Sequence, residues 1–175
     1  MGAKHIDHIA FRVADLEKAV KFYTEVMDFE VTDRFFIDFE DDTKARCAAL
    51  KAKDGQGISI FLSEGVGEGG VVKEWVELHG NALHHIAYAV DDIKSEVAGM
   101  KAKGIQFTTE DVLDSEELTQ IFTRPAPETG IIHEIIQRKG TKSFSVANVK
   151  RLMASTKDLS ASGGKGEKAK PAKKK

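Results

Sequence analysis

The sequence predicts an α+β fold in which two paired βαβββ modules form one curved mixed sheet around a metal site. An internal repeat carries this prediction, because residues 6–20 and 83–97 align without gaps, each around one histidine. The alignment places His8 on His85. If the two copies pack about a pseudo-twofold axis, the two imidazoles converge on one point. Imidazole is the commonest metal-binding side chain, so the repeat itself indicates a metal site.

The first module, about residues 5–65, is expected to run strand, helix and three further strands. Asp15 is the expected N-cap of its helix, because apolar residues follow it at helical spacing. The strands are expected at about 5–13, 29–37, 44–51 and 58–62. A glycine-rich link from Gly65 to Gly70 then leads into a short helix that ends at Gly80.

The second module, about residues 83–138, repeats this order. Its helix is expected from about Asp92 to Lys103, closed by Gly104. Its strands are expected at 83–90 and near 105–109, 118–124 and 131–138. Residues 143–156 lie outside both repeats and have the apolar spacing of a short amphipathic helix, for which we predict the role of a lid over the site.

Composition indicates one domain, residues 1–157, followed by a disordered lysine-rich tail at 158–175. The chain has 175 residues, 41% of them hydrophobic, and a net charge of -2. The tail carries six lysines against two acidic residues, which leaves -6 for the rest. An acidic body argues against nucleic-acid binding as the main function, and no run approaches the ~20 apolar residues of a membrane span. The single cysteine, Cys47, fits a buried structural thiol and a cytoplasmic location.

Strand alternation predicts which way the two histidines face. His8 shares one face of its strand with Ala10 and Arg12, while the apolar residues between them are expected to pack against the helix. His85 shares a face with two alanines in the same way. The same parity places His84 and His133 on the opposite faces of their strands, so neither is predicted as a ligand.

A carboxylate completes the predicted site. Glu134 lies in the most apolar stretch of the chain, where an ionised carboxylate is costly unless it is paired or bound to a metal. The corresponding strand of the first module, residues 58–62, offers no further ligand. Two histidines and one carboxylate with open positions form the arrangement of non-haem Fe(II) oxygenases, so His8, His85 and Glu134 are predicted to bind Fe(II).

These segments resemble the vicinal oxygen chelate superfamily, and within it the catalytic C-terminal half of 4-hydroxyphenylpyruvate dioxygenase. The resemblance covers residues 5–156 and is most specific at 118–125 and 134–138. It implies the fold predicted above, the same three iron ligands and a lid formed by residues 143–156. It also implies a substrate pocket lined by Gln120, which is expected to hydrogen-bond the substrate, and by Phe122, Phe144 and Asn148.

Several positions depart from that family. Ser63 stands where the family has an asparagine, and we place it among the substrate-binding residues. His84 replaces a glutamine, and Val149 replaces the second phenylalanine that clamps an aromatic ring. Despite these changes we still expect dioxygen chemistry, but they leave the identity of the substrate open.

The expected function is therefore an Fe(II)-dependent dioxygenase that uses O2 and a 2-oxo acid or a related aromatic substrate. One alternative is an isomerase similar to methylmalonyl-CoA epimerase, which would need a fourth metal ligand on residues 58–62 and a carboxylate base near 44–50. Another is a non-catalytic binding protein of the bleomycin-resistance type. A single domain of this kind is also a candidate for a homodimer.

Overall fold

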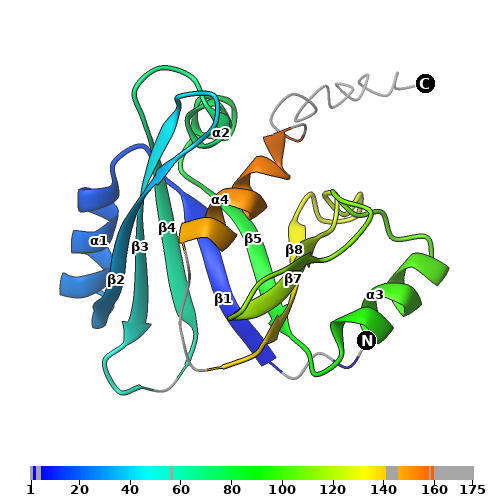
Figure 1. Cartoon of the computed structure of the whole chain (residues 1–175). Coiled ribbons are helices and arrows are strands. Elements are labelled where there is room, and N and C mark those ends of the chain that lie inside the picture. The colour runs from blue at the N-terminus through cyan, green and yellow to red at the C-terminus, as the bar shows by residue number, and fades with distance from the viewer. Residues whose placement is uncertain (1, 3–4, 56, 141–145, 158, 160–175) are drawn as a thin grey trace, which may run out of the picture.

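The structure of the chain, a computed structural model, describes residues 2, 5–55, 57–140, 146–157 and 159. Its centre is one eight-stranded mixed sheet with the strand order β2-β3-β4-β1-β5-β8-β7-β6. The sheet curves strongly, with α1 and α3 on its outer side and α4 across its open side (Figure 1). This architecture confirms the predicted α+β fold with a curved mixed sheet.

The first module follows the predicted order of strand, helix and three strands. Asp15 caps the helix as expected, because its carboxylate accepts a hydrogen bond from the backbone N–H of Lys18. Its elements are β1 (His5–Arg12), α1 (Leu16–Glu25), β2 (Phe29–Asp38), β3 (Lys44–Ala52) and β4 (Ser59–Val66). Helix α2 (Val71–His79) then leads to the second module and ends at Gly80, whose φ of 71° suits a residue without Cβ.

The second module begins with the same signals. Asp92 caps its helix by accepting a hydrogen bond from the backbone N–H of Ser95. Its elements are β5 (Ala82–Ala89), α3 (Ile93–Ala102), β6 (Leu113–Asp114), β7 (Leu118–Phe122) and β8 (Ile132–Arg138). The strand expected near 105–109 is absent from the described residues, where only Phe107 forms a bridge, to Thr123. That prediction is wrong, and the two-residue strand β6 pairs with β7 instead.

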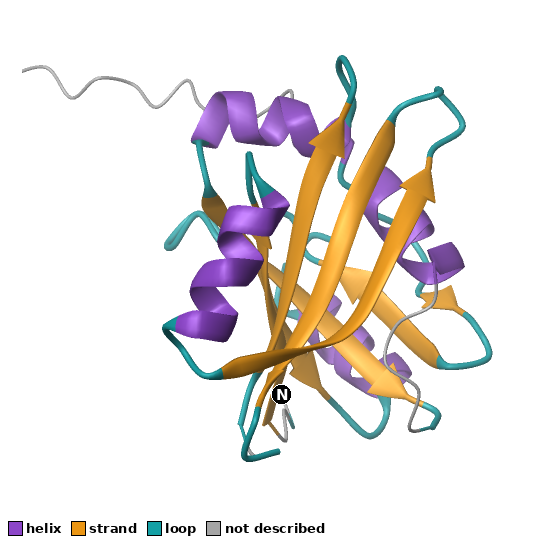
Figure 2. Ribbon diagram, turned by 90° about the vertical axis from the view of Figure 1, so that its left-hand side faces the viewer, coloured by secondary structure: helices purple, strands orange, loops and turns teal. Residues whose placement is uncertain are grey.

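The two modules join at the centre of the sheet. Strands β1 and β5 pair antiparallel, while β1 pairs in parallel with β4 and β5 pairs in parallel with β8. The order β4-β1-β5-β8 is therefore symmetric about the β1–β5 pair. Figure 2 shows the strands of the sheet side by side, with helices around them. This symmetry brings the two repeated strands next to each other, as the pseudo-twofold packing of the repeat requires.

The outer faces of β1 and β8 pack against the module helices. Ile9 and Phe11 join Val13, Leu16 and Val20 in one apolar cluster, so the predicted helix-facing side of β1 is confirmed. The corresponding cluster of the second module contains Ile121, Ile135, Val90, Ile93 and Val97. With both outer faces covered by helices, the side chains between these positions point to the concave side of the sheet.

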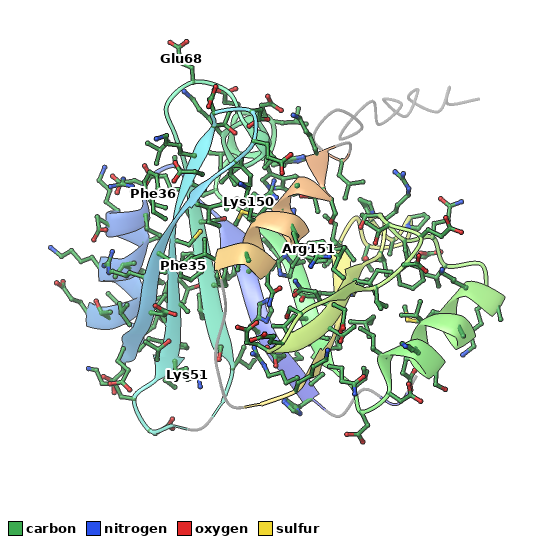
Figure 3. All side chains as sticks on the ribbon, in the orientation of Figure 1. Phe35, Phe36, Lys51, Glu68, Lys150 and Arg151 are labelled. Atoms are coloured by element: carbon green, nitrogen blue, oxygen red, sulfur yellow. The ribbon has the colours of Figure 1, made fainter. Side chains whose placement is uncertain are left out.

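Helix α4 (Val146–Ala154) covers that concave side and contacts the edge strands β2 and β6. Val149, Leu152 and Met153 are buried, as the apolar spacing predicts, whereas Val146 is 45% exposed. Lys150 and Arg151 extend from the helix in Figure 3, and both line a groove beside the β2–β3 turn. The helix is thus amphipathic and packs its apolar side against the concave face of the sheet.

Two predicted boundaries shift. Gly65 belongs to β4 and not to a linker, since it pairs with Ala45 of β3. Leu159 is 3% exposed and packs with Trp75 and Leu152, so the folded chain extends beyond residue 157. The rest of the predicted lysine-rich tail and the start of the predicted lid helix, residues 141–145, lie outside the described residues. None of the described helices is long and apolar enough to cross a membrane.

Candidate metal centre

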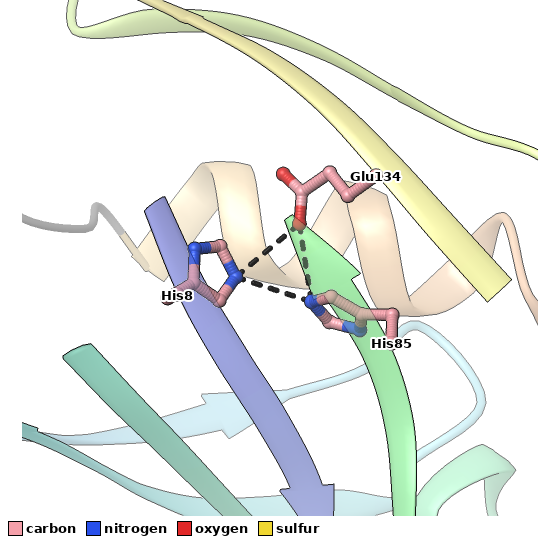
Figure 4. Close-up of side chains that lie close together, drawn as sticks. All are labelled: His8, His85 and Glu134. Atoms are coloured by element: carbon pink, nitrogen blue, oxygen red, sulfur yellow. Dashed lines mark hydrogen bonds and ion pairs between the residues drawn. The ribbon is translucent and has the colours of Figure 1, made fainter. Parts of the chain in front are cut away.

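The repeated histidines meet on the concave side of the sheet. Nε2 of His8 lies 3.1 Å from Nε2 of His85, although 77 positions separate them in the sequence. Both side chains are buried, and Figure 4 shows them directed toward one another from β1 and β5. The convergence expected from the repeat is confirmed.

Glu134 reaches the same point from β8. Its Oε2 lies 3.3 Å from Nε2 of His8 and 3.1 Å from Nε2 of His85. The position follows from the sheet register, because Glu134 pairs with Ala87, two residues beyond His85. In the first module the equivalent residue is Phe61 of β4, which pairs with Ala10 of β1. The two modules thus supply three polar side chains and one phenyl ring.

The three side chains fit a divalent metal ion. At bond lengths of about 2.1 Å, neighbouring ligands of an octahedral ion lie about 3.0 Å apart. The three ligand atoms are separated by 3.1, 3.1 and 3.3 Å. Glu134 is fully buried, and neither of its oxygens accepts a hydrogen bond of normal geometry within the described part of the chain. A buried carboxylate with unused lone pairs between two imidazoles is what a cation would satisfy.

Acidic partners surround His8. Its Nδ1 lies 2.9 Å from Oδ1 of Asp7, and Asp7 in turn accepts hydrogen bonds from Nε and Nη2 of Arg138, at 2.6 and 2.7 Å. Burial alone would lower the pKa of His8, but Glu134 and Asp7 outweigh it and raise the pKa to about 9. The pKa of Asp7 falls far below its usual value despite burial, because Arg138 and His8 stabilise the carboxylate.

His85 has a less charged environment. Burial lowers its pKa to about 4, although Glu134 favours the protonated form. Burial would also raise the pKa of Glu134, but the two imidazoles lower it to about 2. Without a metal, the site therefore holds a cationic His8, a neutral His85 and an ionised Glu134 at neutral pH.

The structure corrects the prediction for His84. The pairing of β1 with β5 shifts register between Ala10 and Phe11, which pair with His85 and Leu83 respectively. His84 is the extra residue of this β-bulge, so strand parity fails there. Its side chain is buried, faces the concave side, and its Nδ1 lies 2.8 Å from Nδ1 of His85.

His133 obeys the predicted parity. It lies on the outer face of β8, where its ring contacts Tyr88 at 5.6 Å between centroids. Its side chain points away from the three clustered side chains, because Glu134, the next residue of the strand, faces the opposite side of the sheet. The structure therefore brings together His8, His85 and Glu134 and leaves His133 apart, as predicted.

A cavity lies between the three clustered side chains and α4. Four predicted substrate-binding or catalytic residues line it: Ser63, Gln120, Phe122 and Asn148. Phe122 packs against His85, with ring centroids 4.7 Å apart, and Gln120 donates a long hydrogen bond of 3.4 Å to the carbonyl oxygen of Asn148. Phe144, the remaining predicted pocket residue, lies outside the described residues.

The cavity is partly open to solvent in this structure. It contains about 470 Å³ of empty space when its mouth toward solvent is included. Val149, Leu152 and Met153 of α4 form part of the cavity wall.

Arg12 is a cavity residue to which the sequence assigned no role. It is 2% exposed, lines the cavity and lies on the same face of β1 as His8. The signal that could have found it is a permanent charge on an inward-facing strand position, which is rare in protein interiors.

Comparison with known proteins identifies the superfamily of the chain. A profile of the glyoxalase/bleomycin resistance protein/dioxygenase superfamily matches residues 7–123. The chain belongs to this superfamily. Its sequence is 27% identical to 4-hydroxyphenylpyruvate dioxygenase of Legionella pneumophila (strain Corby) over 86% of the chain and 53% of the relative. It is 33% identical to a probable lactoylglutathione lyase of Vibrio cholerae over 79% of the chain and 94% of the relative.

Two solved structures show the superfamily fold. A mutant of 4-hydroxymandelate synthase from Streptomyces coelicolor matches with a TM-score of 0.76 and 24% identity, over 88% of this chain and 53% of that one. Methylmalonyl-CoA epimerase from Mycobacterium tuberculosis matches with a TM-score of 0.66 and 20% identity, over 79% of this chain and 90% of that one. The chain thus spans about half the length of its dioxygenase and synthase relatives. Superfamily membership is settled, whereas the relatives differ in activity.

Proposed function

We propose that this superfamily member is an Fe(II)-dependent dioxygenase that acts on a 2-oxo acid, with His8, His85 and Glu134 as iron ligands. The observation that carries the proposal is the set of two imidazoles and one buried carboxylate with ligand atoms 3.1–3.3 Å apart. Three protein ligands leave positions open for substrate and O2, which is the arrangement of non-haem Fe(II) oxygenases. The similarity to 4-hydroxyphenylpyruvate dioxygenase supports the same assignment.

The surroundings of the site suit a reaction that must exclude water. Phe61, Val149 and Leu152 give the cavity an apolar wall, and α4 covers it. Fe(II), when bound, supplies a Lewis acid for the keto and carboxylate oxygens of the substrate and a site for O2. The protein binds and orients the substrate around that ion, and closure of α4 separates the reaction from solvent.

Two side chains are proposed to orient the substrate. Gln120 lies on β7 with its amide in the cavity, and its present hydrogen bond to the Asn148 carbonyl is long enough to be exchanged for a substrate oxygen. Phe122 packs beside His85 and offers a flat apolar surface to the body of the substrate. Asn148 connects α4 to the turn between β6 and β7, because its Nδ2 donates to Oγ of Ser115 at 2.7 Å.

The test uses the full chain loaded with Fe(II) under anaerobic conditions. Titration with a panel of 2-oxo acids, phenylpyruvates included, should produce the visible charge-transfer absorption of a bidentate chelate, and admission of air should then consume O2. Gln120→Ala should reduce turnover without loss of bound iron, and His133→Ala serves as a control. A catechol that produces the absorption where every 2-oxo acid fails would indicate ring cleavage and overturn the proposal.

An isomerase is the second candidate, because methylmalonyl-CoA epimerase matches over 90% of its own length. The residues of the cavity wall argue against an isomerase. At the fourth ligand position of the symmetric site stands Phe61, and the inward positions of β3 include Cys47 and Ala49 rather than a carboxylate. Metal preference separates the two: an isomerase would work with Co(II) and without O2.

A further inference from the structure

The cavity contains one buried positive charge, Arg12, that no acidic side chain among the described residues neutralises. The guanidinium of Arg12 donates from Nη1 to the carbonyl oxygen of Val71 at 2.7 Å and from Nη2 to Oγ1 of Thr156 at 3.0 Å. Both acceptors are neutral. No carboxylate in the described part of the chain lies within ion-pair distance of Arg12. A buried charge without a counterion is costly, which indicates that a ligand supplies the missing negative charge.

A ring nitrogen without a hydrogen-bond partner lies in the same cavity as Arg12. His84 is buried, lines the same cavity, and its Nε2 has no hydrogen-bond partner among the described residues. When His85 binds a metal through Nε2, its Nδ1 carries a proton and donates to Nδ1 of His84. The remaining proton of a neutral His84 must then sit on Nε2. The metal site thus fixes the tautomer in which His84 offers a free N–H.

Trp75 holds the two donors together. The guanidinium of Arg12 lies over its indole at 5.3 Å from the ring centroid, and the ring of His84 meets the same indole edge-to-face at 4.7 Å. This stacking fixes the planes of both groups, since a guanidinium prefers an aromatic face. The two donors are therefore pre-organised and do not depend on a flexible surface loop.

We propose that Arg12 and His84 form an anion subsite at the far end of the cavity, which binds a second acidic group of the substrate. The inference rests on the proposed function and narrows its substrate class to 2-oxo acids that carry another carboxylate or a comparable anion. Arg12 lies four residues after His8 on one strand, about 13 Å away between Cα atoms. An extended substrate with its 2-oxo acid end at the triad directs its other end toward Arg12. Among the described residues that line the cavity, Arg12 carries the one permanent charge.

The experiment compares diacids with monoacids of equal chain length. The full chain is loaded with Co(II), which does not turn over O2 in this role, and is titrated by calorimetry and visible absorption. The diacids are 2-oxoglutarate, 2-oxoadipate and 2-oxosuberate, and each monoacid lacks the distal carboxylate. The wild type should bind at least one diacid about 10–100-fold more tightly than its monoacid, the range of hydrogen bonds to charged groups. Arg12→Met should lose this preference and keep its metal.

Two further variants separate recognition from folding. Arg46→Met is the matched control, because Arg46 is paired with Glu64 on the outer side of the sheet and should leave the preference intact. His84→Phe should reduce the preference about threefold to tenfold, while His84→Gln, which restores a donor, should recover it. These substitutions test the subsite even if Arg12→Met unfolds.

The outcomes distinguish this inference from the proposed function. Equal binding of diacids and monoacids to the wild type, with normal absorption changes, would overturn the subsite and leave the proposed function in place. If no 2-oxo acid changes the absorption, the proposed function fails. The subsite is then decided by titration of succinate into the metal-free protein, where binding to the wild type and loss in Arg12→Met support it and absence of binding overturns it.

Discussion

Strands β1 and β5 are repeats of each other, yet they hold their histidines in opposite electrostatic environments. His8 is backed by the carboxylate of Asp7, itself paired with Arg138, and its pKa rises to about 9. His85 is backed by the neutral ring of His84, and burial lowers its pKa to about 4. The two modules thus supply imidazoles at equivalent positions that differ in basicity. Burial and the shared carboxylate of Glu134 act on both imidazoles, and the comparison teaches that the residue behind each one, Asp7 or His84, is what differs between them.

The second difference between the modules lies on the strands that flank β1 and β5. In parallel register, Phe61 on β4 and Glu134 on β8 occupy equivalent positions. A symmetric site would have four ligands, whereas this one has three and a phenyl ring at the fourth corner. The asymmetry leaves one side of the site apolar.

The largest effect is expected from removal of a ligand in either half. His8→Ala, His85→Ala and Glu134→Ala should each weaken binding of Fe(II) or Co(II) more than 100-fold, which exceeds the 10–100-fold typical of outer-shell changes. The two histidines should be equally necessary despite their different pKa values. Calorimetry and metal analysis after gel filtration measure the loss. His133→Ala, a histidine on the outer face of β8, should bind metal like the wild type, and an equal loss there would contradict the assignment.

The next effect concerns pH and separates the two histidines directly. Metal binding requires neutral imidazoles, so at pH 7 His8 must release about one proton while His85 and Glu134 release none. The apparent affinity should rise about tenfold per pH unit up to pH 9, where it levels off. Calorimetry of Co(II) binding in buffers of different ionisation enthalpy counts the protons. No release at pH 7 would show that His8 is already neutral.

The same pKa shift makes a linked prediction for the metal-free protein. Because the folded-state pKa of His8 is raised from 6.5 to about 9, its protonated form stabilises the fold. That contribution is complete below about pH 6.5 and is lost as the pH rises through 9. Thermal unfolding of the metal-free chain over this range should show the decrease, and Asp7→Asn should diminish it.

A smaller change in metal affinity is expected from the residues behind the ligands. Asp7→Asn removes the charge behind His8 and should weaken metal binding about 10–100-fold. His84→Gln keeps an acceptor for Nδ1 of His85 and should change the affinity little. Glu17→Gln, which breaks an exposed pair with Arg34, serves as the control. Equal effects of Asp7→Asn and His84→Gln would remove the proposed contrast between the halves.

Much of this site could be predicted from the sequence, because its residues follow simple periodicities. The repeat aligned His8 with His85, and alternation along regular strands gave the inward face of His8, His85 and Glu134. The register of parallel strands, which the sequence does not encode locally, was needed to bring Glu134 to the same point. Only the paired strands reveal that Phe61 is its counterpart in the first module.

The errors fall where a local rule met a tertiary irregularity. His84 was placed on the wrong face because the β-bulge opposite Ala10 and Phe11 shifts the alternation by one residue. A full strand was expected near 105–109, but only Phe107 pairs there, since the end of the sheet is built by β6. The pairing of Asp7 with Arg138 spans 131 positions and left no signal in either segment.

The smallest expected change restores the missing symmetry. Phe61→Glu would place a carboxylate at the position equivalent to Glu134, on a strand that already faces the site. The substitution should destabilise the metal-free protein, because it adds a buried negative charge and removes a buried phenyl ring. With metal, the new carboxylate should act as a fourth ligand, tighten binding about tenfold and occupy a position that substrate or O2 requires. Melting curves with and without Co(II) measure the first two effects, and O2 uptake with Fe(II) measures the third.

Phe61→Gln is the matched control for lost packing without added charge. If Phe61→Glu gains no metal affinity over Phe61→Gln, then position 61 does not face the metal, and the pseudo-symmetric relation between β4 and β8 does not extend to the site.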